Sequence, residues 1–307
     1  MYGSDDPDLK QRRREAMSAL RISIELPVHG VTFAQVRELA RACEAAGLDG
    51  VWVPDHLVSL RPDGETPLEC TTLLAALAAT TTLRIGPLVL ALPLRAHALL
   101  ALQMRTLAAL APGRLVLGVG LGGFTYRRAA RALGVTARDD AERAATLADD
   151  VARLRASVQE DAAQPVPVWL GGRSRAVLDA AARVADGWNC PFVAELEARS
   201  RELDRACAAA GRDPATLTRS VYCLAALAES DAEARRRADA ARTMTRLFGD
   251  LERAHVFGTP PRALARLREL RALGVSEVVL HIAGDHASKL DAVALLARDV
   301  LPALRAG

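Results

Sequence analysis

Several features that are common in proteins of other classes are missing from this chain. No uninterrupted apolar run approaches the roughly 20 residues that a membrane helix needs, and residues 1–20 are charged and lack the apolar stretch of a signal peptide. We therefore expect a cytoplasmic protein, with residues 1–20 as a charged, flexible extension and residues 21–307 as a single domain. The net charge is +3, and charged residues of both signs are interspersed along the sequence, so neither a nucleic acid nor a membrane is expected as a partner.

Motifs for metal binding, disulfides and nucleophilic catalysis are also lacking. The five cysteines are odd in number, scattered and never spaced as C-x-x-C, which favours buried thiols over disulfides or a zinc site. No two histidines stand at H-x-H or H-x-x-x-H spacing, so no metal is expected. No G-x-S-x-G elbow occurs, and this argues against acyl transfer.

What the chain does have is a regular alternation of apolar runs of strand length with amphipathic helical segments. Half of the residues are hydrophobic, which is enough for a large core. The runs span 22–26, 51–53, 83–90, 114–119, 166–170, 187–190, 219–227 and 277–282. Helical spacing of apolar residues is found between them, from Phe33 to Gly47 and over 68–79, 98–109, 138–158, 175–185, 195–210, 231–248, 261–273 and 289–304. Eight such alternations predict an α/β protein with the (β/α)8 TIM-barrel fold rather than an open doubly wound sheet.

Asp55 and His56 end the second run, where a parallel barrel places its ligands. A carboxylate beside an imidazole can orient the ring and tune its pKa toward neutrality, so that the ring accepts or donates a proton. The alternative is a helix-capping Asp next to an ordinary loop histidine. The position at the end of a strand favours the functional interpretation. His29, just after the first run, is expected to line a substrate pocket.

Two glycine-containing turns are candidates for ligand binding. Gly171, Gly172, Arg173 and Ser174 lie between a strand and a helix, where backbone N–H groups and a guanidinium can hold a phosphate, although an ordinary tight turn is an equal alternative. Residues 118–123 formally match G-x-G-x-x-G. A dinucleotide-binding site would need a second strand about 20 residues later. The stretch 127–138 has instead a helical and charged pattern, so we expect the glycines to allow close approach of a ligand ring.

Seven segments, in order, resemble the luciferase-like monooxygenase family of (β/α)8 barrels, especially its branch that uses the deazaflavin coenzyme F420. The resemblance covers about residues 21–304, and its markers are residues 44–56, 83–90, 113–120, 170–172, 185–189, 258–260 and 272–275. It implies an F420-dependent oxidoreductase that transfers hydride to or from a small organic substrate, and a homodimer. An FMN-dependent monooxygenase supplied by a flavin reductase is the alternative, and a barrel that binds without a cofactor is a further one.

The resemblance also implies roles for individual residues. His56, with Asp55 beside it, would face the reactive ring and assist proton or hydride chemistry. Gly171 and Gly172 would hold the cofactor phosphate, and a cis peptide at Leu88–Val89 would support the ring. Gly120, Leu121 and Gly122 would flank the same ring.

The chain departs from the sugar-phosphate dehydrogenases of this branch. They carry a Trp where Leu60 stands and a Glu where Gly123 stands, so the resemblance argues against that substrate. A Thr common in the family is replaced by Leu121, and the insertion that usually precedes the fifth strand is nearly absent, which suggests an open pocket or one completed by a partner.

Overall fold

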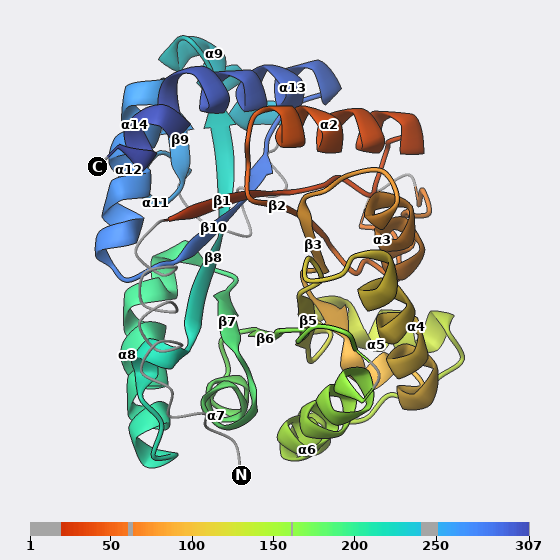
Figure 1. Cartoon of the computed structure of the whole chain (residues 1–307). Helices are drawn as coiled ribbons and strands as arrows, with labels where there is room; N and C mark the ends of the chain where they lie inside the picture. Colours follow the sequence, from red (N-terminus) through yellow and green to blue (C-terminus); the bar gives the residue numbers. More distant parts are fainter. Residues whose placement is uncertain (1–19, 61–63, 161, 241–250, 307) are drawn as a thin grey trace.

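The computed structural model describes residues 20–60, 64–160, 162–240 and 251–306. Within them the strands form one parallel sheet that curves into a barrel, with helices on its outside (Figure 1). The predicted α/β barrel is therefore confirmed. Of the expected N-terminal extension, residues 1–19 lie outside the described residues, and Leu20 is buried in the core.

The strands follow the chain with few departures from the prediction. They are β1 (Arg21–Glu25), β2 (Gly50–Val53), β3 (Arg84–Pro87), β4 (Leu90–Ala91), β5 (Leu117–Gly120), β6 (Val168–Gly171), β7 (Gly187–Cys190), β8 (Thr218–Leu227), β9 (Val256–Gly258) and β10 (Glu277–Ile282). Their order in the sheet is β3-β2-β1-β10-β8-β7-β6-β5-β4, and β9 pairs with the end of β8. The sequence did not predict β9, because a run of three residues is too short to show a period.

The barrel closes where the third predicted run divides into two strands. β3 and β4 are separated by Leu88 and Val89, whose peptide bond is cis, as the resemblance implied. On the far side of this break β4 pairs with β5, and Ile85 of β3 bridges to Leu115. The ends of the sheet order are thereby joined through the chain itself.

Helices cover the outer surface of the strands on all sides in Figure 1. They are α2 (Phe33–Ala45), α3 (Cys70–Ala78), α4 (His97–Leu110), α5 (Tyr126–Ala132), α6 (Asp140–Gln159), α7 (Arg175–Val184), α8 (Leu196–Ala209), α9 (Asp231–Ala240), α11 (Leu251–Ala254), α12 (Pro260–Ala272), α13 (His286–Leu295) and α14 (Leu301–Arg305), with a π-helical turn at Leu296–Val300. The helix expected over 231–248 is observed as α9, and its remainder lies outside the described residues. Among the described helices, none combines the length and apolar character that a membrane crossing requires.

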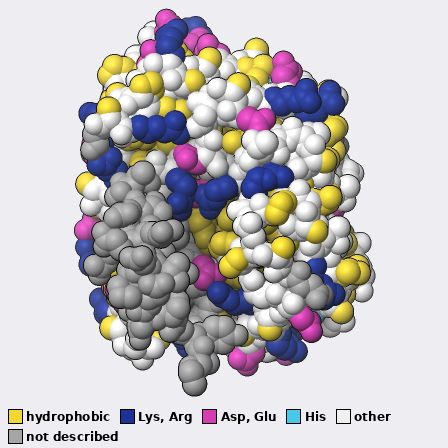
Figure 2. Space-filling model, viewed as in Figure 1, with side chains coloured by type: hydrophobic (Ala, Val, Ile, Leu, Met, Phe, Trp, Pro, Cys, Tyr) yellow, Lys and Arg dark blue, Asp and Glu magenta, His cyan; other side chains and the backbone are white. Residues whose placement is uncertain are grey.

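The two faces of the strands carry different side chains because successive residues point in opposite directions. Residues facing the helices are aliphatic, as Ile22 and Ile24 of β1 and Val278 and Leu280 of β10 illustrate. The interior instead holds glycines, polar groups and a layer in which Trp52 stacks on Trp169, with ring centroids 5.0 Å apart. On the outer surface seen in Figure 2, basic and acidic side chains are interspersed.

The floor of the barrel is closed by a buried carboxylate. Glu277, at the start of β10, accepts hydrogen bonds from Arg21 Nε (3.0 Å), Arg84 Nη1 (2.8 Å), Ser23 Oγ (2.8 Å) and Trp52 Nε1 (2.9 Å). Burial alone would raise its pKa, but the two guanidinium groups and these donors outweigh burial and lower it to about 2. Chemistry is therefore expected at the opposite end, where the strands end and the loops begin.

Candidate active site

On one side of the barrel mouth, two glycines at strand ends make room for the side chain of Val89. We call Val89, Gly120 and Gly171 the glycine arc. A Cβ at Gly120 would lie 2.7 Å from Val89 Cγ2 and 2.9 Å from the carbonyl oxygen of Gly171, and a Cβ at Gly171 would lie 2.7 Å from Val89 Cγ1. Such distances exclude any larger residue, so three strand ends meet at Val89. Leu88, the other residue of the cis bond, packs against both the tryptophan layer and apolar side chains of β8 and β9.

The turn after β6 differs in one respect from the expected phosphate site. The N–H of Gly172 donates to the carbonyl oxygen of Asn189 at 3.2 Å, and Trp188 Nε1 donates to the carbonyl oxygen of Gly172 at 2.8 Å. Both backbone groups of Gly172 are thus engaged by β7. The donors left for a phosphate are the first-turn N–H groups of α7, which has Ser174 as its N-cap.

Arg173 extends from this turn toward the next loop. Its guanidinium pairs with Glu195 and lies 4.8 Å from the ring centroid of Phe192. The Arg173 side chain is about half exposed (52%). Because its guanidinium is already paired with Glu195, a phosphate bound at α7 would have to compete with that carboxylate. Arg173 therefore lies at the expected turn, with its guanidinium directed at Glu195.

The loop after β5 is held in place by Arg143 of α6. Arg143 of α6 donates to the carbonyl oxygen of Leu121, pairs with Asp140 and lies 3.9 Å from the ring centroid of Tyr126. Gly122 has φ +91, a conformation that favours glycine, and a Cβ there would lie 2.9 Å from Tyr126. Leu121 and Gly122 therefore form a fixed rim directly after Gly120.

Asp55 does not orient His56 as the sequence suggested. Its carboxylate accepts from the N–H of Ala91 at 2.8 Å and pairs with Arg95. The side chain is 1% exposed, and burial raises its pKa despite the opposing effect of Arg95. Asp55 thus ties the end of β2 to β4, which is a structural role.

The ring of His56 instead contacts His29 across the mouth. His56 Nδ1 and His29 Nε2 are 3.0 Å apart, and which of the two nitrogens donates depends on the tautomer. Burial lowers the pKa of His56 to about 4, with Glu25 opposing this effect and with His29 and His281 adding to it. His56 is therefore a neutral imidazole at pH 7.

A second polar group stands beside these histidines, and the sequence argument did not identify it. His281 Nδ1 lies 2.6 Å from Glu25 Oε2, and the hydroxyl of Tyr222 donates to the same oxygen at 3.0 Å. Burial and the nearby Glu25 raise the pKa of Tyr222 well above its usual value, so this hydroxyl stays protonated. We call Glu25, His29, His56, Tyr222 and His281 the polar arc.

The signal for the missed residues was present in the strand pattern. In β1, Ser23 and Glu25 alternate with Ile22 and Ile24, and a polar residue on the inward face of a barrel strand near its C-terminal end is expected to face the mouth. Sequence reasoning proposed neither His281 nor Tyr222 as a site residue. Among the described residues, no three His, Cys, Asp or Glu side chains are grouped so that they could hold a metal ion.

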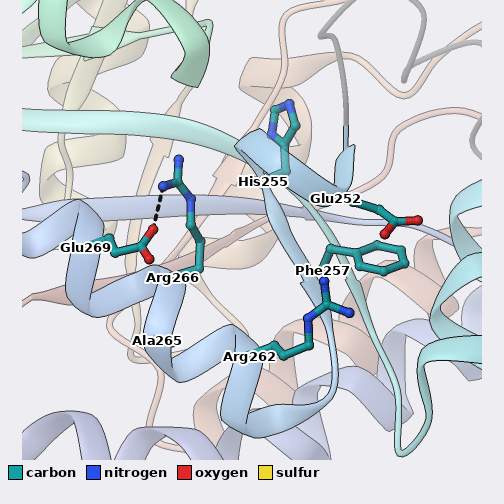
Figure 3. A pocket seen from close by; sticks show the side chains of 7 residues that line it. All are labelled: Glu252, His255, Phe257, Arg262, Ala265, Arg266 and Glu269. Carbon is teal, nitrogen blue, oxygen red and sulfur yellow. Dashed lines mark hydrogen bonds and ion pairs between the residues drawn. The ribbon is translucent and has the colours of Figure 1, made fainter.

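A separate cavity of about 250 Å³ lies on the side of the barrel, between α11, β9 and α12 (Figure 3). Arg266 pairs there with Glu269 at 2.8 Å, and Arg262 lies 5.4 Å from the ring centroid of Phe257 and pairs with Asp231. The cavity includes no residue of either arc. Its cations are already paired with carboxylates, and we assign it no part in the chemistry of the mouth.

Comparison with known proteins places this site in context. The family model described as luciferase-like monooxygenase matches residues 16–274. The chain is 31% identical over 177 residues to an F420-dependent glucose-6-phosphate dehydrogenase of Kineococcus radiotolerans, covering 51% of this chain and 52% of that protein. The chain therefore spans about half the length of that relative. A protein of the same name from Intrasporangium calvum is 27% identical over 310 residues, covering 85% of this chain and 92% of that protein.

The fold is shared with solved structures. An F420-dependent secondary alcohol dehydrogenase, in complex with an F420–acetone adduct, superposes with a TM-score of 0.78 at 16% identity, covering 94% of this chain and 99% of that one. At this level of identity the likeness supports the barrel fold alone.

Proposed function

The chain belongs to the luciferase-like monooxygenase family, and on that premise we propose that it is a coenzyme F420-dependent oxidoreductase that transfers hydride to or from a small organic substrate. The observation that carries this proposal is the arrangement of the mouth. On some strand ends two glycines pack against the side chain of Val89, and other strand ends carry imidazole and carboxylate groups that can bind or release protons. The curated relatives named as F420-dependent dehydrogenases support it.

The residues of the glycine arc fit a flat ring system. The Val89 side chain fills the space that a Cβ at Gly120 or Gly171 would take, so neither of these two residues adds a side chain to the surface on which a planar group would rest. The first turn of α7 offers N–H groups and a helix dipole to a phosphate, with Ser174 at the cap and Arg173 beside it. Bound there, coenzyme F420 supplies a two-electron hydride acceptor or donor.

His56 is the proposed proton carrier. With Nδ1 bonded to His29, Nε2 is the nitrogen that exchanges a proton with a bound molecule. A neutral imidazole at pH 7 is ready to accept that proton, and the pKa of about 4 makes the protonated form a strong acid. Asp55 would act only by holding the strand end on which His56 stands.

Coenzyme F420 is preferred over FMN because the curated relatives carry that cofactor in their names. Purified protein titrated with F420, with reduced F420 and with FMN, followed by fluorescence, tests this choice. We expect saturable binding of F420. Binding of FMN alone would favour the monooxygenase alternative, in which a flavin reductase supplies reduced flavin.

A barrel that binds without catalysing is the remaining alternative. His56→Ala should lower hydride transfer about 100-fold or more and leave F420 affinity within a few-fold of wild type. If neither cofactor binds and no turnover depends on His56, the chain is a binding protein rather than an enzyme.

We propose a homodimer formed through the outer face of α4. Leu99, Leu102 and Leu110 are exposed by 57%, 53% and 46%, and they lie on one side of this helix. A row of exposed leucines on one helix is typical of a surface that meets a partner. Leu102→Glu should shift the protein to monomer in analytical ultracentrifugation. Leu273→Glu, at an exposed leucine after α12, is the matched control and should leave the wild-type state unchanged.

The proposed location is the cytoplasm. All five cysteines are buried free thiols, which suits a reducing compartment.

A further inference from the structure

The rim after β5 is fastened to two helices by one guanidinium group. Arg143, near the start of α6, donates from Nη1 to the carbonyl oxygen of Leu121 and from Nη2 to Asp140 Oδ1 at 2.6 Å. Its Cζ lies 3.9 Å from the ring centroid of Tyr126, the first residue of α5. A single side chain therefore joins the rim, α5 and α6.

The ring of Tyr126 extends this contact to the next residue of the rim. A Cβ at Gly122 would lie 2.9 Å from Tyr126 Cδ2 and 3.4 Å from Ala91 Cβ. Tyr126 is buried, and its hydroxyl accepts from the N–H of Arg138 in the loop before α6. The side chain of Leu121 packs against the main core. Both residues of the rim are thus held by packing as well as by the guanidinium.

The surroundings of Arg143 contribute little to stability. Its side chain is 8% exposed, whereas that of its carboxylate partner, Asp140, is 83% exposed. Among the residues that the structure describes, none bonds to Nε of Arg143. Burying a cation costs free energy that an exposed, solvated partner offsets only in part. An apolar side chain of similar length would therefore serve the stability of the fold about as well.

We propose that Arg143 is a positioning residue for the cofactor. It holds Leu121 and Gly122 in the shape against which a planar ring packs, and its contribution appears in binding rather than in stability. The inference rests on the proposed function, in which the ring lies beside this rim. A loop that already has its bound shape strengthens binding, because no free energy of binding is spent on ordering it.

The contacts require a guanidinium rather than any cation. The planar fork donates in two directions, to Leu121 and to Asp140, while its face lies over the ring of Tyr126. An ammonium group is a point charge on a flexible stem and does not reproduce this fork. Arg143→Lys therefore keeps the charge and loses the geometry.

The experiment compares cofactor affinity with stability. Arg143→Met removes the fork and leaves an unbranched apolar side chain in its place. F420 binding, followed by fluorescence titration, should weaken about 10-fold, because the rim must then be ordered when the ring binds. The urea midpoint should move by about 0.5 M or less, since the cost of burying the charge is removed with it. Arg143→Lys should also bind F420 about 10-fold more weakly.

The same helix offers a matched control. Arg153 pairs with Asp150, three residues earlier, just as Arg143 pairs with Asp140, but the Arg153 side chain is 68% exposed. Arg153→Met should leave F420 affinity and the urea midpoint as in wild type. An equal loss of affinity in Arg153→Met and Arg143→Met would trace the effect to the helix as a whole and overturn the inference.

Hydrogen exchange on the cofactor-free protein reports on the rim directly. The N–H groups of residues 120–126 should exchange about 10-fold faster in Arg143→Met than in wild type, because the rim opens more often. In Arg153→Met they should exchange as in wild type.

The outcomes separate this inference from the function it rests on. If the wild-type protein does not bind F420, the proposed function is overturned, and hydrogen exchange alone decides whether Arg143 positions the rim. If wild type binds F420 and Arg143→Met binds it equally well, the inference is overturned and the function stands. A large fall in the urea midpoint of Arg143→Met, with unchanged affinity of the folded protein, assigns Arg143 a purely structural role and also overturns the inference.

Discussion

Two carboxylates inside the same barrel have opposite surroundings. Glu277 begins β10 and Glu25 ends β1, and because Arg21 pairs in register with Glu277, the two acids stand four residues apart along paired strands, or about 13 Å. Glu277 is held by two guanidinium groups, a hydroxyl and an indole N–H. Glu25 is held by an imidazole and a phenol. The carboxylate of the floor is thus paired with guanidinium groups that are always charged, whereas the carboxylate of the mouth contacts a ring and a neutral hydroxyl.

The largest expected effect comes from breaking the floor. Glu277→Gln leaves Arg21 and Arg84 without their buried counter-charge, and we expect the free energy of unfolding to fall by about 3–5 kcal/mol. Urea denaturation followed by circular dichroism measures it. F420 affinity of the folded fraction should be unchanged, and a variant as stable as wild type would show that Glu277 is not needed to close the floor.

The corresponding substitution at the mouth should lower activity while leaving the free energy of unfolding almost unchanged. Glu25→Gln is expected to lower kcat about 10-fold, because it removes the carboxylate that favours the protonated form of His56. The free energy of unfolding should change by less than about 1.5 kcal/mol, since the amide oxygen still accepts from Tyr222. Steady-state kinetics and urea denaturation of one preparation give both numbers. A stability loss as large as that of Glu277→Gln would remove the distinction between the two ends.

A change in the glycine arc tests whether the mouth is shaped by contact rather than by charge. Gly171→Ala places a Cβ 2.7 Å from Val89, and we expect a loss of about 1–3 kcal/mol in unfolding free energy and at least 10-fold weaker F420 binding by fluorescence titration. Gly134→Asn is the control. Gly134 has φ +66 and open space around it, a conformation that Asn tolerates, so cofactor affinity should stay as in wild type.

The response to acid should also distinguish the two ends of the barrel, because each end loses stability over a different range of pH. His56 has a pKa of about 4 when folded, below the usual 6.5, so the unfolded chain binds its proton first and stability falls as the pH drops from 6.5 to 4. The contribution of Glu277, with a pKa of about 2 against the usual 4.5, is present above pH 4.5 and is lost as the pH falls toward 2. Urea midpoints across pH 2–7 should show both ranges, and His56→Asn should remove only the upper one.

The sequence predicted the scaffold well because the barrel depends on local apolar runs. Strand ends, the cis bond at Leu88–Val89 and the turn at Gly171 lie where the runs and the family markers indicated. These features are encoded by residues near one another in the chain. The break between β3 and β4 was read as one continuous run, since Leu88 and Val89 are as apolar as a strand interior.

The partners within the mouth were harder to predict because they come from distant strands. Asp55 and His56 are neighbours in sequence, yet Asp55 bonds Ala91 and Arg95 while His56 bonds His29. The Glu25–His281 contact joins residues from opposite ends of the chain, which become neighbours only when β1 pairs with β10. Adjacent residues at a strand end point to different sides, so adjacency in sequence was misleading there.

The indoles of the barrel have an optical consequence. The chain has three tryptophans, and all of them stand on barrel strands: Trp52 on β2, Trp169 on β6 and Trp188 on β7. Trp52 and Trp169 are stacked inside the barrel, in a layer against which Leu88 packs. Trp188 packs in the core on the helix side of the strands, and its N–H is bonded to the carbonyl oxygen of Gly172. Ultraviolet emission of this protein therefore comes from indoles on both faces of the strands that surround the site proposed for a deazaflavin chromophore. Occupancy can be followed by quenching in the wild-type protein without attaching a label.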